Sequence, residues 1–311
     1  MLIKTIPLRD GRTDVTLTTY VISESPELGG KRKRPAILVC PGGAYMGCSD
    51  REAEPVALRF AAMGYHTFVL RYSVYTEGKR DAATGQGAIE PKPHTMHPAP
   101  LQDIGMAMLA IHEHADEWLV DTERIALCGF SAGAHNSAMY AVYWNTPMAW
   151  QSGIVPKACN PAAVILSYPL TDYVLMREKT KKMEERLQQF LKMHMLVYLG
   201  ETEPDIATLE MASPARNVNN DTPPMFIWST AKDALVPIEN TYVMAQALAQ
   251  HGIPCEVHVF EDGEHGLSLA DQSSAPYQVF LEPDAAKWVG LAEAWLHKRF
   301  ALEIPDQSLD F

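Results

Sequence analysis

Ser131 stands in the stretch Gly-Phe-Ser-Ala-Gly-Ala-His, residues 129–135, directly after the apolar run 124–128. A Gly-x-Ser-x-Gly pattern in this setting predicts a sharp turn from a strand into a helix, with the serine hydroxyl exposed at its tip. The small flanking residues let the strand and the helix approach closely. Such a serine can attack a carbonyl carbon when a base, an orienting acid and an oxyanion site lie beside it. The alternative is a glycine-rich turn with an idle serine.

The candidate base is His265, in the segment Phe-Glu-Asp-Gly-Glu-His-Gly at 260–266, which follows the last predicted strand. A glycine-flanked position beyond the carboxyl end of a strand suits a side chain that must reach the serine. Other histidines lie in or beside predicted strands and helices, in the loop before residue 100 or in the helix behind the serine: His66, His251, His258, His112, His114, His297, His94, His97 and His135. The HxxH pair in that loop is a weak metal signature because it has no clear third ligand.

Two aspartates follow predicted strands and compete for the role of orienting acid. Asp233 comes just past the strand 224–229 and just before a helix that starts near residue 237, whereas Asp172 follows the strand 163–168. Ligands of such sheets bind outside the carboxyl ends of the strands, so both aspartates are suitably placed. Asp233 is the preferred acid and Asp172 its rival, and capping the following helix is the structural alternative for Asp233.

The turn Pro-Gly-Gly-Ala-Tyr, residues 41–45, ends an earlier apolar strand. Small residues there let backbone amides face a substrate oxygen with no side chain in the way. Amides of this turn, together with the amide of Ala132, would then form an oxyanion hole. Tyr45, beside the turn, is a candidate wall for an acyl pocket, and packing in the core is the equal alternative.

Strands alternate with helices along most of the chain. Apolar runs predict strands at 15–22, 35–40, 66–71, 124–128, 163–168, 224–229 and 255–260, of which the first is antiparallel. Helical spacing predicts helices at 52–63, 104–115, 131–144, 238–249 and 288–300, and an amphipathic helical insert at 174–199. This order predicts a mostly parallel, doubly wound α/β sheet with helices on both faces, in a single domain over residues 1–311. The proline-rich segment 74–100 is too long for a plain connector and predicts a functional loop at the mouth of a site.

The order Ser131, Asp233, His265, with Gly-Phe-Ser-Ala-Gly on the turn and the 41–45 segment upstream, resembles the α/β-hydrolase superfamily. Within it the chain is similar to the esterase and lipase branch that includes acetyl-xylan-esterase-like carbohydrate esterases. Many relatives there carry His-Gly-Gly-Gly in place of 41–44, which implies Gly43 and Ala44 as oxyanion donors beside Ala132. The resemblance also implies that the 74–100 loop and the 174–199 insert form a small partial cap.

The composition of the chain limits the classes of partner that it can bind. A net charge of -12 argues against binding to a nucleic-acid phosphate backbone. No run approaches the length of a membrane helix and the N-terminal residues lack an export pattern, so we expect a cytoplasmic protein with no membrane partner. The five cysteines form no CxxC pair, and Cys40 and Cys128 lie in apolar strands, which favours buried free thiols. An exposed edge strand could pair two copies as a homodimer.

These residues together predict a serine carboxylester hydrolase that acts on small ester substrates through an acyl-enzyme. The chemistry needs no metal and no organic cofactor. Family analogy favours short acyl esters, with acetylated sugars or xylo-oligosaccharides as the leading substrates. A small peptidase of the prolyl-oligopeptidase type is the alternative within the class, and a non-catalytic hydrolase fold that acts as a binding module is the alternative outside it.

Overall fold

The computed structural model is built on one eight-stranded sheet with the order β1-β2-β4-β3-β5-β6-β7-β8. The structure describes residues 1–28, 30–79, 89–150, 152–153, 156, 158–302 and 304. The strands are β1 (Thr5–Arg9), β2 (Arg12–Tyr20), β3 (Arg34–Cys40), β4 (His66–Arg71), β5 (Val120–Phe130), β6 (Ala163–Ser167), β7 (Met225–Thr230) and β8 (Cys255–Phe260). The strands from β4 to β8 pair in parallel, and β1 and β2 run antiparallel at one edge. The mostly parallel sheet that the sequence predicted is confirmed.

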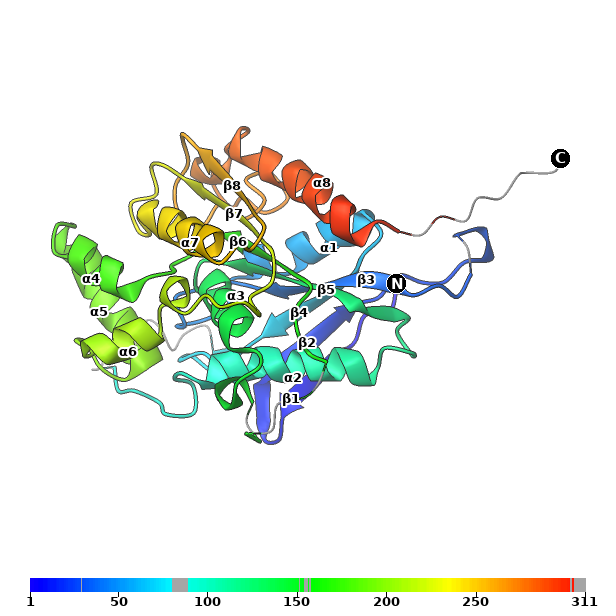
Figure 1. Cartoon of the computed structure of the whole chain (residues 1–311), viewed down its shortest axis with the longest axis horizontal. Coiled ribbons are helices and arrows are strands. Elements are labelled where there is room, and N and C mark those ends of the chain that lie inside the picture. The colour runs from blue at the N-terminus through cyan, green and yellow to red at the C-terminus, as the bar shows by residue number, and fades with distance from the viewer. Residues whose placement is uncertain are drawn as a thin grey trace.

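Helices cover both faces of this sheet (Figure 1). The first face packs against α1 (Glu54–Ala62) and α8 (Trp288–Phe300), and the opposite face against α2 (Ala99–Glu113), α3 (Ala132–Tyr143) and α7 (Glu239–Gln250). Each face has its own apolar core, because successive side chains of a strand point to opposite sides of the sheet. Among the described helices, none is long and apolar enough to cross a bilayer.

The N-terminal strand is the second arm of a hairpin. In β2 the side chains of Val15 and Leu17 are fully buried, while those of Thr16 and Thr18 are half-buried, as the alternating pattern predicts. The sequence did not predict β1, whose short segment is partly exposed and contains Pro7. Proline is tolerated in such a strand because β1 lies at the edge of the sheet, where one row of backbone amides needs no partner.

The insert at 174–199 forms two helices, α4 (Tyr173–Thr180) and α5 (Glu185–Leu199), and a third, α6 (Ile206–Met211), follows them. The three lie together at one side of the molecule (Figure 1). A turn over residues 181–184 separates α4 from α5, with backbone bonds from Lys182 to Lys179 and from Met183 to Thr180. The insert is therefore folded back on itself, which brings α5 over the carboxyl ends of the strands.

The cysteines carry free thiols. Cys40 and Cys128 are completely buried in β3 and β5, as the sequence predicted. Burial raises the pKa of Cys40 to about 12, so this thiol stays protonated at neutral pH. These two cysteines therefore act as small apolar core residues.

Candidate functional site

Ser131 lies at the turn between β5 and α3, in a backbone conformation that few residues adopt. Its φ is 50° and its ψ is -118°. The turn is possible because its two glycines leave room for neighbouring backbone. A Cβ at Gly129 would lie 2.4 Å from the Gly133 carbonyl oxygen, and a Cβ at Gly133 would lie 2.0 Å from the Cys40 carbonyl oxygen. The sharp turn that the sequence predicted is present and its backbone is strained, and a 3.0 Å bond from the Ser131 amide to the Ser167 carbonyl anchors it.

The structure brings Ser131, His265 and Asp233 into one hydrogen-bonded array. His265 Nε2 lies 2.7 Å from Ser131 Oγ, and His265 Nδ1 lies 2.6 Å from Asp233 Oδ2. The second carboxylate oxygen, Asp233 Oδ1, accepts bonds from the amides of Leu235 and Val236, both at 2.9 Å. Because the carboxylate is fixed at both oxygens, it holds the imidazole with Nδ1 protonated and leaves Nε2 to accept the serine proton.

The electrostatics of the array favour a protonated imidazole. Burial alone lowers the pKa of His265, but the charge of Asp233, its hydrogen bond and the charge of Glu52 outweigh burial and raise that pKa above its ordinary value. The Asp233 side chain is almost completely buried and that of His265 is 15% exposed. The imidazolium that forms when a base takes the serine proton is therefore stabilised where it arises.

Asp172, the rival acid, has a different role. Its Oδ1 accepts bonds from the amides of Val174 and Leu175 and so caps the N-terminus of α4. Its Oδ2 accepts a 2.9 Å bond from Arg216 Nε. Both oxygens are thus occupied by structural partners, and Asp233 is the aspartate that contacts the histidine.

The turn after β3 is strained in the same way as the serine turn. Ala44 and Tyr45 both have φ near 55°, at 55° and 57°, and Gly43 has a φ of 132°. A Cβ at Gly43 would lie 2.2 Å from the Gly47 carbonyl oxygen, so only glycine fits there. Ala44, Ser131 and Ala132 all line one narrow pocket. Gly43 and Ala44 share the lining of a second pocket with Ser131, so each of the three predicted oxyanion donors lines a pocket that Ser131 also lines.

Ser131 lies between two pockets of different size and polarity. The inner pocket is narrow, with a volume of about 20 Å³, and is lined by Ala44, Ser131, Ala132, His135, Leu170, Tyr173, Phe190, Leu191, His194, Leu235 and Val236. The outer pocket has a volume of about 330 Å³ and is lined by Gly43, Ala44, Met46, Ser49, Arg51, Glu52, Ser131, Phe190, Leu235, His265, Gly266 and Phe280. Besides Ser131, the residues Ala44, Phe190 and Leu235 belong to both linings.

Two neutral histidines form part of the inner wall. His135 Nε2 donates to the Ala212 carbonyl, so its Nδ1 accepts a 2.6 Å bond from the Tyr45 hydroxyl. His194 Nδ1 donates to the Ala44 carbonyl and its Nε2 accepts from the Tyr173 hydroxyl. Burial lowers the pKa of His135 to about 3 and that of His194 to about 4, so neither carries charge at neutral pH.

Tyr45 lies behind this wall. It is 1% exposed, and its ring stacks on Tyr198 with 4.0 Å between centroids. Its hydroxyl contacts His135, which is one of the described residues that line the inner pocket. These contacts favour the packing role for Tyr45. The wall histidine that the sequence did not single out is His194, which only the fold of α5 brings to the site.

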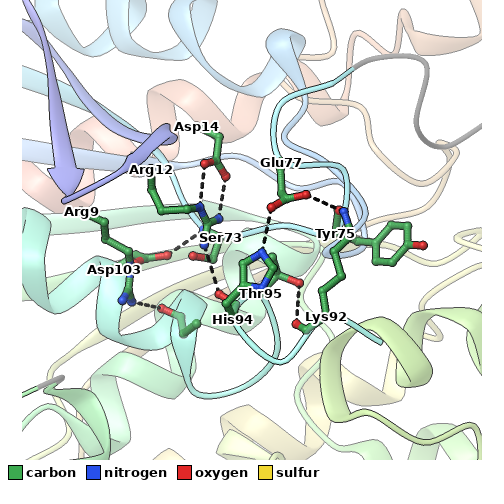
Figure 2. Close-up of polar contacts among 11 residues, drawn as sticks. Arg9, Arg12, Asp14, Ser73, Tyr75, Glu77, Lys92, His94, Thr95 and Asp103 are labelled. Carbon is green, nitrogen blue, oxygen red and sulfur yellow. Dashed lines mark hydrogen bonds and ion pairs between the residues drawn. The ribbon is translucent and has the colours of Figure 1, made fainter. Parts of the chain in front are cut away.

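The described parts of the 74–100 segment fold back on the N-terminal hairpin (Figure 2). Glu77 accepts bonds from Lys92 and from His94 Nε2, and Arg12 of β2 donates to the His94 carbonyl. At the end of the segment, the His97 ring bonds to the hydroxyl of Tyr198 in α5 at 3.1 Å, which links the segment to that helix. Residues 80–88 lie outside the described residues. Of the two segments predicted to form a cap, the described residues that line the two pockets belong to the 174–199 insert.

Metal ligands do not gather at this site in the part of the chain that the structure describes. There, no group of three or more His, Cys, Asp or Glu side chains could hold a metal ion. The His94 and His97 rings of the HxxH pair contact different partners, Glu77 and Tyr198.

The sequence predictions missed Glu52 and Tyr168. Glu52 is 3% exposed, and its two carboxylate oxygens contact the Gly42 amide at 2.8 Å and the Tyr168 hydroxyl at 2.6 Å. The Tyr168 ring packs edge-on against the His265 ring, with 5.1 Å between centroids. No local pattern marks a glutamate that becomes buried only in the folded chain.

Comparisons with solved structures define the class. The carboxylesterase Cest-2923 from Lactobacillus plantarum has a TM-score of 0.77 and 27% identity, and the match covers 98% of this chain and 100% of that one. The acetyl ester-xyloside bifunctional hydrolase from Caldicellulosiruptor lactoaceticus has a TM-score of 0.71 and 28% identity, over 95% and 96% of the two chains. Together with the sheet order, these likenesses show an α/β-hydrolase fold of the esterase kind.

A family model assigns the chain to one family within this class. The BD-FAE model matches residues 90–248, about half of the chain, so the chain belongs to the BD-FAE family. Endo-1,4-beta-xylanase B from Butyrivibrio fibrisolvens is 30% identical over 77% of this chain and 33% of its own length. The chain thus spans about a third of that relative and about half of the esterase LipQ from Mycobacterium tuberculosis, to which it is also similar.

The two aspartates can be distinguished by the protonation of His265. Replacing Asp233 with Asn removes the negative charge that raises the His265 pKa, and because the Leu235 and Val236 amides hold the remaining side-chain oxygen, an NH2 group then faces Nδ1, so we expect that pKa to fall. An NMR titration of the His265 imidazole measures it directly. The matched control is Asp172→Asn, which changes an equal charge that bonds to α4 and Arg216 instead. A His265 pKa that is unchanged in Asp233→Asn, or lowered equally in both variants, contradicts this assignment.

Proposed function

We propose that this chain is a serine carboxylester hydrolase in which Ser131 is the nucleophile, His265 the general base and Asp233 the orienting acid. The observation that carries the proposal is the array of 2.7 Å and 2.6 Å contacts that His265 makes to the other two side chains. Solved structures similar over nearly the whole chain are named as a carboxylesterase and as an acetyl ester-xyloside hydrolase, which supports the same chemistry.

The reaction begins when Ser131 Oγ attacks the ester carbonyl carbon and His265 Nε2 accepts its proton. The tetrahedral intermediate collapses as the imidazolium donates that proton to the departing alcohol, which leaves an acyl-enzyme on Ser131. A water molecule then repeats the two steps and releases the acid. Asp233 keeps its negative charge throughout and holds the imidazole in the orientation that both proton transfers need.

The negative oxygen of the intermediate needs hydrogen-bond donors at the serine. We assign this role to the amides of Ala132 and of Gly43 or Ala44, because Gly43, Ala44 and Ala132 lie around Ser131 in the two pocket linings. The strained backbone of the 43–45 turn supports the assignment, since sites that are built in advance of the reaction often store such strain. A single donor of this kind lowers the barrier by about 3–4 kcal/mol in comparable sites.

The two pockets suggest which end of the ester lies where. The inner pocket of about 20 Å³ has room for a group close to the size of one or two water molecules, which suits the methyl group of an acetyl. The outer pocket of about 330 Å³ is open and carries Ser49, Arg51 and Glu52, so it suits a polar alcohol such as a sugar. Acetylated sugars or xylo-oligosaccharides are therefore the substrate class that we propose.

Removing the nucleophile tests the reaction class. We expect Ser131→Ala to lose about 10⁴-fold or more in kcat/KM on 4-nitrophenyl acetate, because no other group can form the acyl-enzyme. The same assay compares wild type on an acetylated xylo-oligosaccharide and on a prolyl amide. Faster turnover of the amide than of the esters would favour a prolyl-oligopeptidase-like peptidase. Activity unchanged in Ser131→Ala would refute the serine mechanism, and no turnover of any substrate would favour a binding module.

The size of the inner pocket sets the acyl preference. We expect wild type to favour acetyl over butyryl esters by about 10-fold or more, because each added methylene must enter a space that is already filled. Phe190→Ala widens the wall between the pockets and should raise the ratio of butyryl to acetyl turnover. Phe280→Ala is the matched control, since Phe280 lines the outer pocket and not the inner one. Equal ratios in wild type and both variants would rule out the assignment of the inner pocket to the acyl group.

A further inference from the structure

Glu52 is a buried acidic residue that the proposed reaction does not use. It ends the short helical turn Asp50–Glu52, is 3% exposed and lies at the floor of the outer pocket. A carboxylate buried this deeply is costly unless its oxygens are bonded, and both of them are. One accepts from the Gly42 amide at 2.8 Å and the other from the Tyr168 hydroxyl at 2.6 Å.

The groups that contact Glu52 can satisfy an ionised carboxylate. The Tyr168 oxygen itself accepts a 2.9 Å bond from the Ser268 amide, so its hydroxyl hydrogen is free to point at Glu52. The Gly42 amide can only donate. With the Tyr168 hydroxyl as donor, both partners satisfy an ionised carboxylate.

The two bonds reach the two halves of the candidate catalytic machinery. Gly42 directly precedes Gly43 in the oxyanion turn, and a Cβ at Gly42 would lie 2.8 Å from the Glu52 carboxylate and 2.9 Å from Ser131 Cβ. On the other side, Tyr168 packs against the His265 ring. It also bonds to the amide of Ser268, in the loop that carries that histidine.

Arg51, the residue next to Glu52, makes further bonds to the loop that carries His265. The Arg51 carbonyl accepts a 2.7 Å bond from the Ser268 hydroxyl, and the Arg51 guanidinium donates to the Gly266 carbonyl at 3.0 Å. That guanidinium also lies over the ring of Phe280, 4.4 Å from its centroid. The segment Asp50–Glu52 is thus bonded to the histidine loop on one side and to the oxyanion turn on the other.

We propose that Glu52 is a positioning residue that fixes the distance between the oxyanion turn and His265 and that supplies a negative charge to the protonated imidazole. The inference rests on the proposed function, because it names what holds the donors and the base of that reaction in register. Glu52 acts through Gly42 and through Tyr168 and does not touch the reacting atoms.

Glu52 and the charged and titratable groups around it shift one another's pKa values. Arg51 on its own turn, Tyr168 after β6 and His265 after β8 face Glu52. Burial raises the pKa of Glu52, although the bonds from Tyr168 and Gly42 and the charges of Arg51 and His265 oppose that rise. The charge of Glu52 in turn raises the pKa of His265, after the larger effects of burial and Asp233.

Two substitutions at position 52 separate the effect of side-chain length from the effect of side-chain charge. Glu52→Gln keeps the length and removes the charge, so we expect the acid limb of the kcat/KM profile to move to lower pH. The reason is that the base works only when neutral, and the loss of a nearby negative charge lets His265 release its proton at a lower pH. Glu52→Asp keeps the charge and shortens the side chain, so the acid limb should stay near that of wild type.

Both variants should lower kcat by about 10- to 100-fold with little change in KM, because a displaced oxyanion turn weakens binding of the transition state more than that of the substrate. Glu54→Gln is the matched control, since it removes an equal charge two residues further on, at an exposed position. Tyr168→Phe provides an independent variant, which keeps the ring against His265 and removes the hydroxyl. It should lower kcat and leave the acid limb in place.

An NMR titration of the His265 imidazole in wild type and Glu52→Gln needs no substrate and keeps the two proposals distinguishable. A lower His265 pKa in Glu52→Gln supports the inference even if wild type hydrolyses no ester, an outcome that would refute the proposed function alone. An unchanged His265 pKa, or kcat values equal to wild type in Glu52→Asp and Tyr168→Phe, overturns the inference. If Glu52→Gln does not fold, Glu52→Asp and Tyr168→Phe decide through kcat and KM.

Discussion

The hydrogen bond between His265 Nδ1 and Asp233 is the constraint on which the rest of the site depends. It selects the tautomer of the imidazole, and that tautomer leaves Nε2 to accept a proton from Ser131. Burial alone would lower the pKa of the ring and make Nε2 a weaker base, and the adjacent carboxylate reverses this effect on the pKa. The sheet contributes by ending β5, β7 and β8 at the same edge, where three side chains that are far apart in the sequence meet.

Around this array the chain places rigid, strained turns on one side and an insert on the other. The turns at Ser131 and at residues 43–45 hold backbone conformations that the neighbouring strands and glycines enforce. The insert carries Phe190 and His194 of α5 to the inner pocket, where the His194 ring bonds to the Ala44 carbonyl. The insert therefore limits the space in the inner pocket, which the proposed function assigns to the acyl group.

The strand-end residues were predictable from the sequence because each follows its strand within a few positions, so Ser131, Asp233 and His265 could be placed before the fold was known. Element boundaries were less predictable: α1 begins at Glu54 and not at residue 52, because Pro55 fits the first turn of a helix and Glu52 belongs to the preceding turn. Glu52 itself could not be predicted as part of the site. Its partners Gly42 and Tyr168 lie on separate strand ends, and no local spacing encodes a contact that only the folded sheet creates.

Trapping the covalent intermediate is the sharpest test of whether Ser131 attacks an ester carbonyl with His265 as its base. Wild type is mixed with 4-nitrophenyl acetate, quenched in acid within the first turnovers and digested for peptide mass spectrometry. We expect the added mass of an acetyl group on the peptide that contains Ser131, reduced in Asp233→Asn and absent in Ser131→Ala. Acetylation at another residue, or rapid hydrolysis with Ser131 unmodified throughout, would contradict this mechanism.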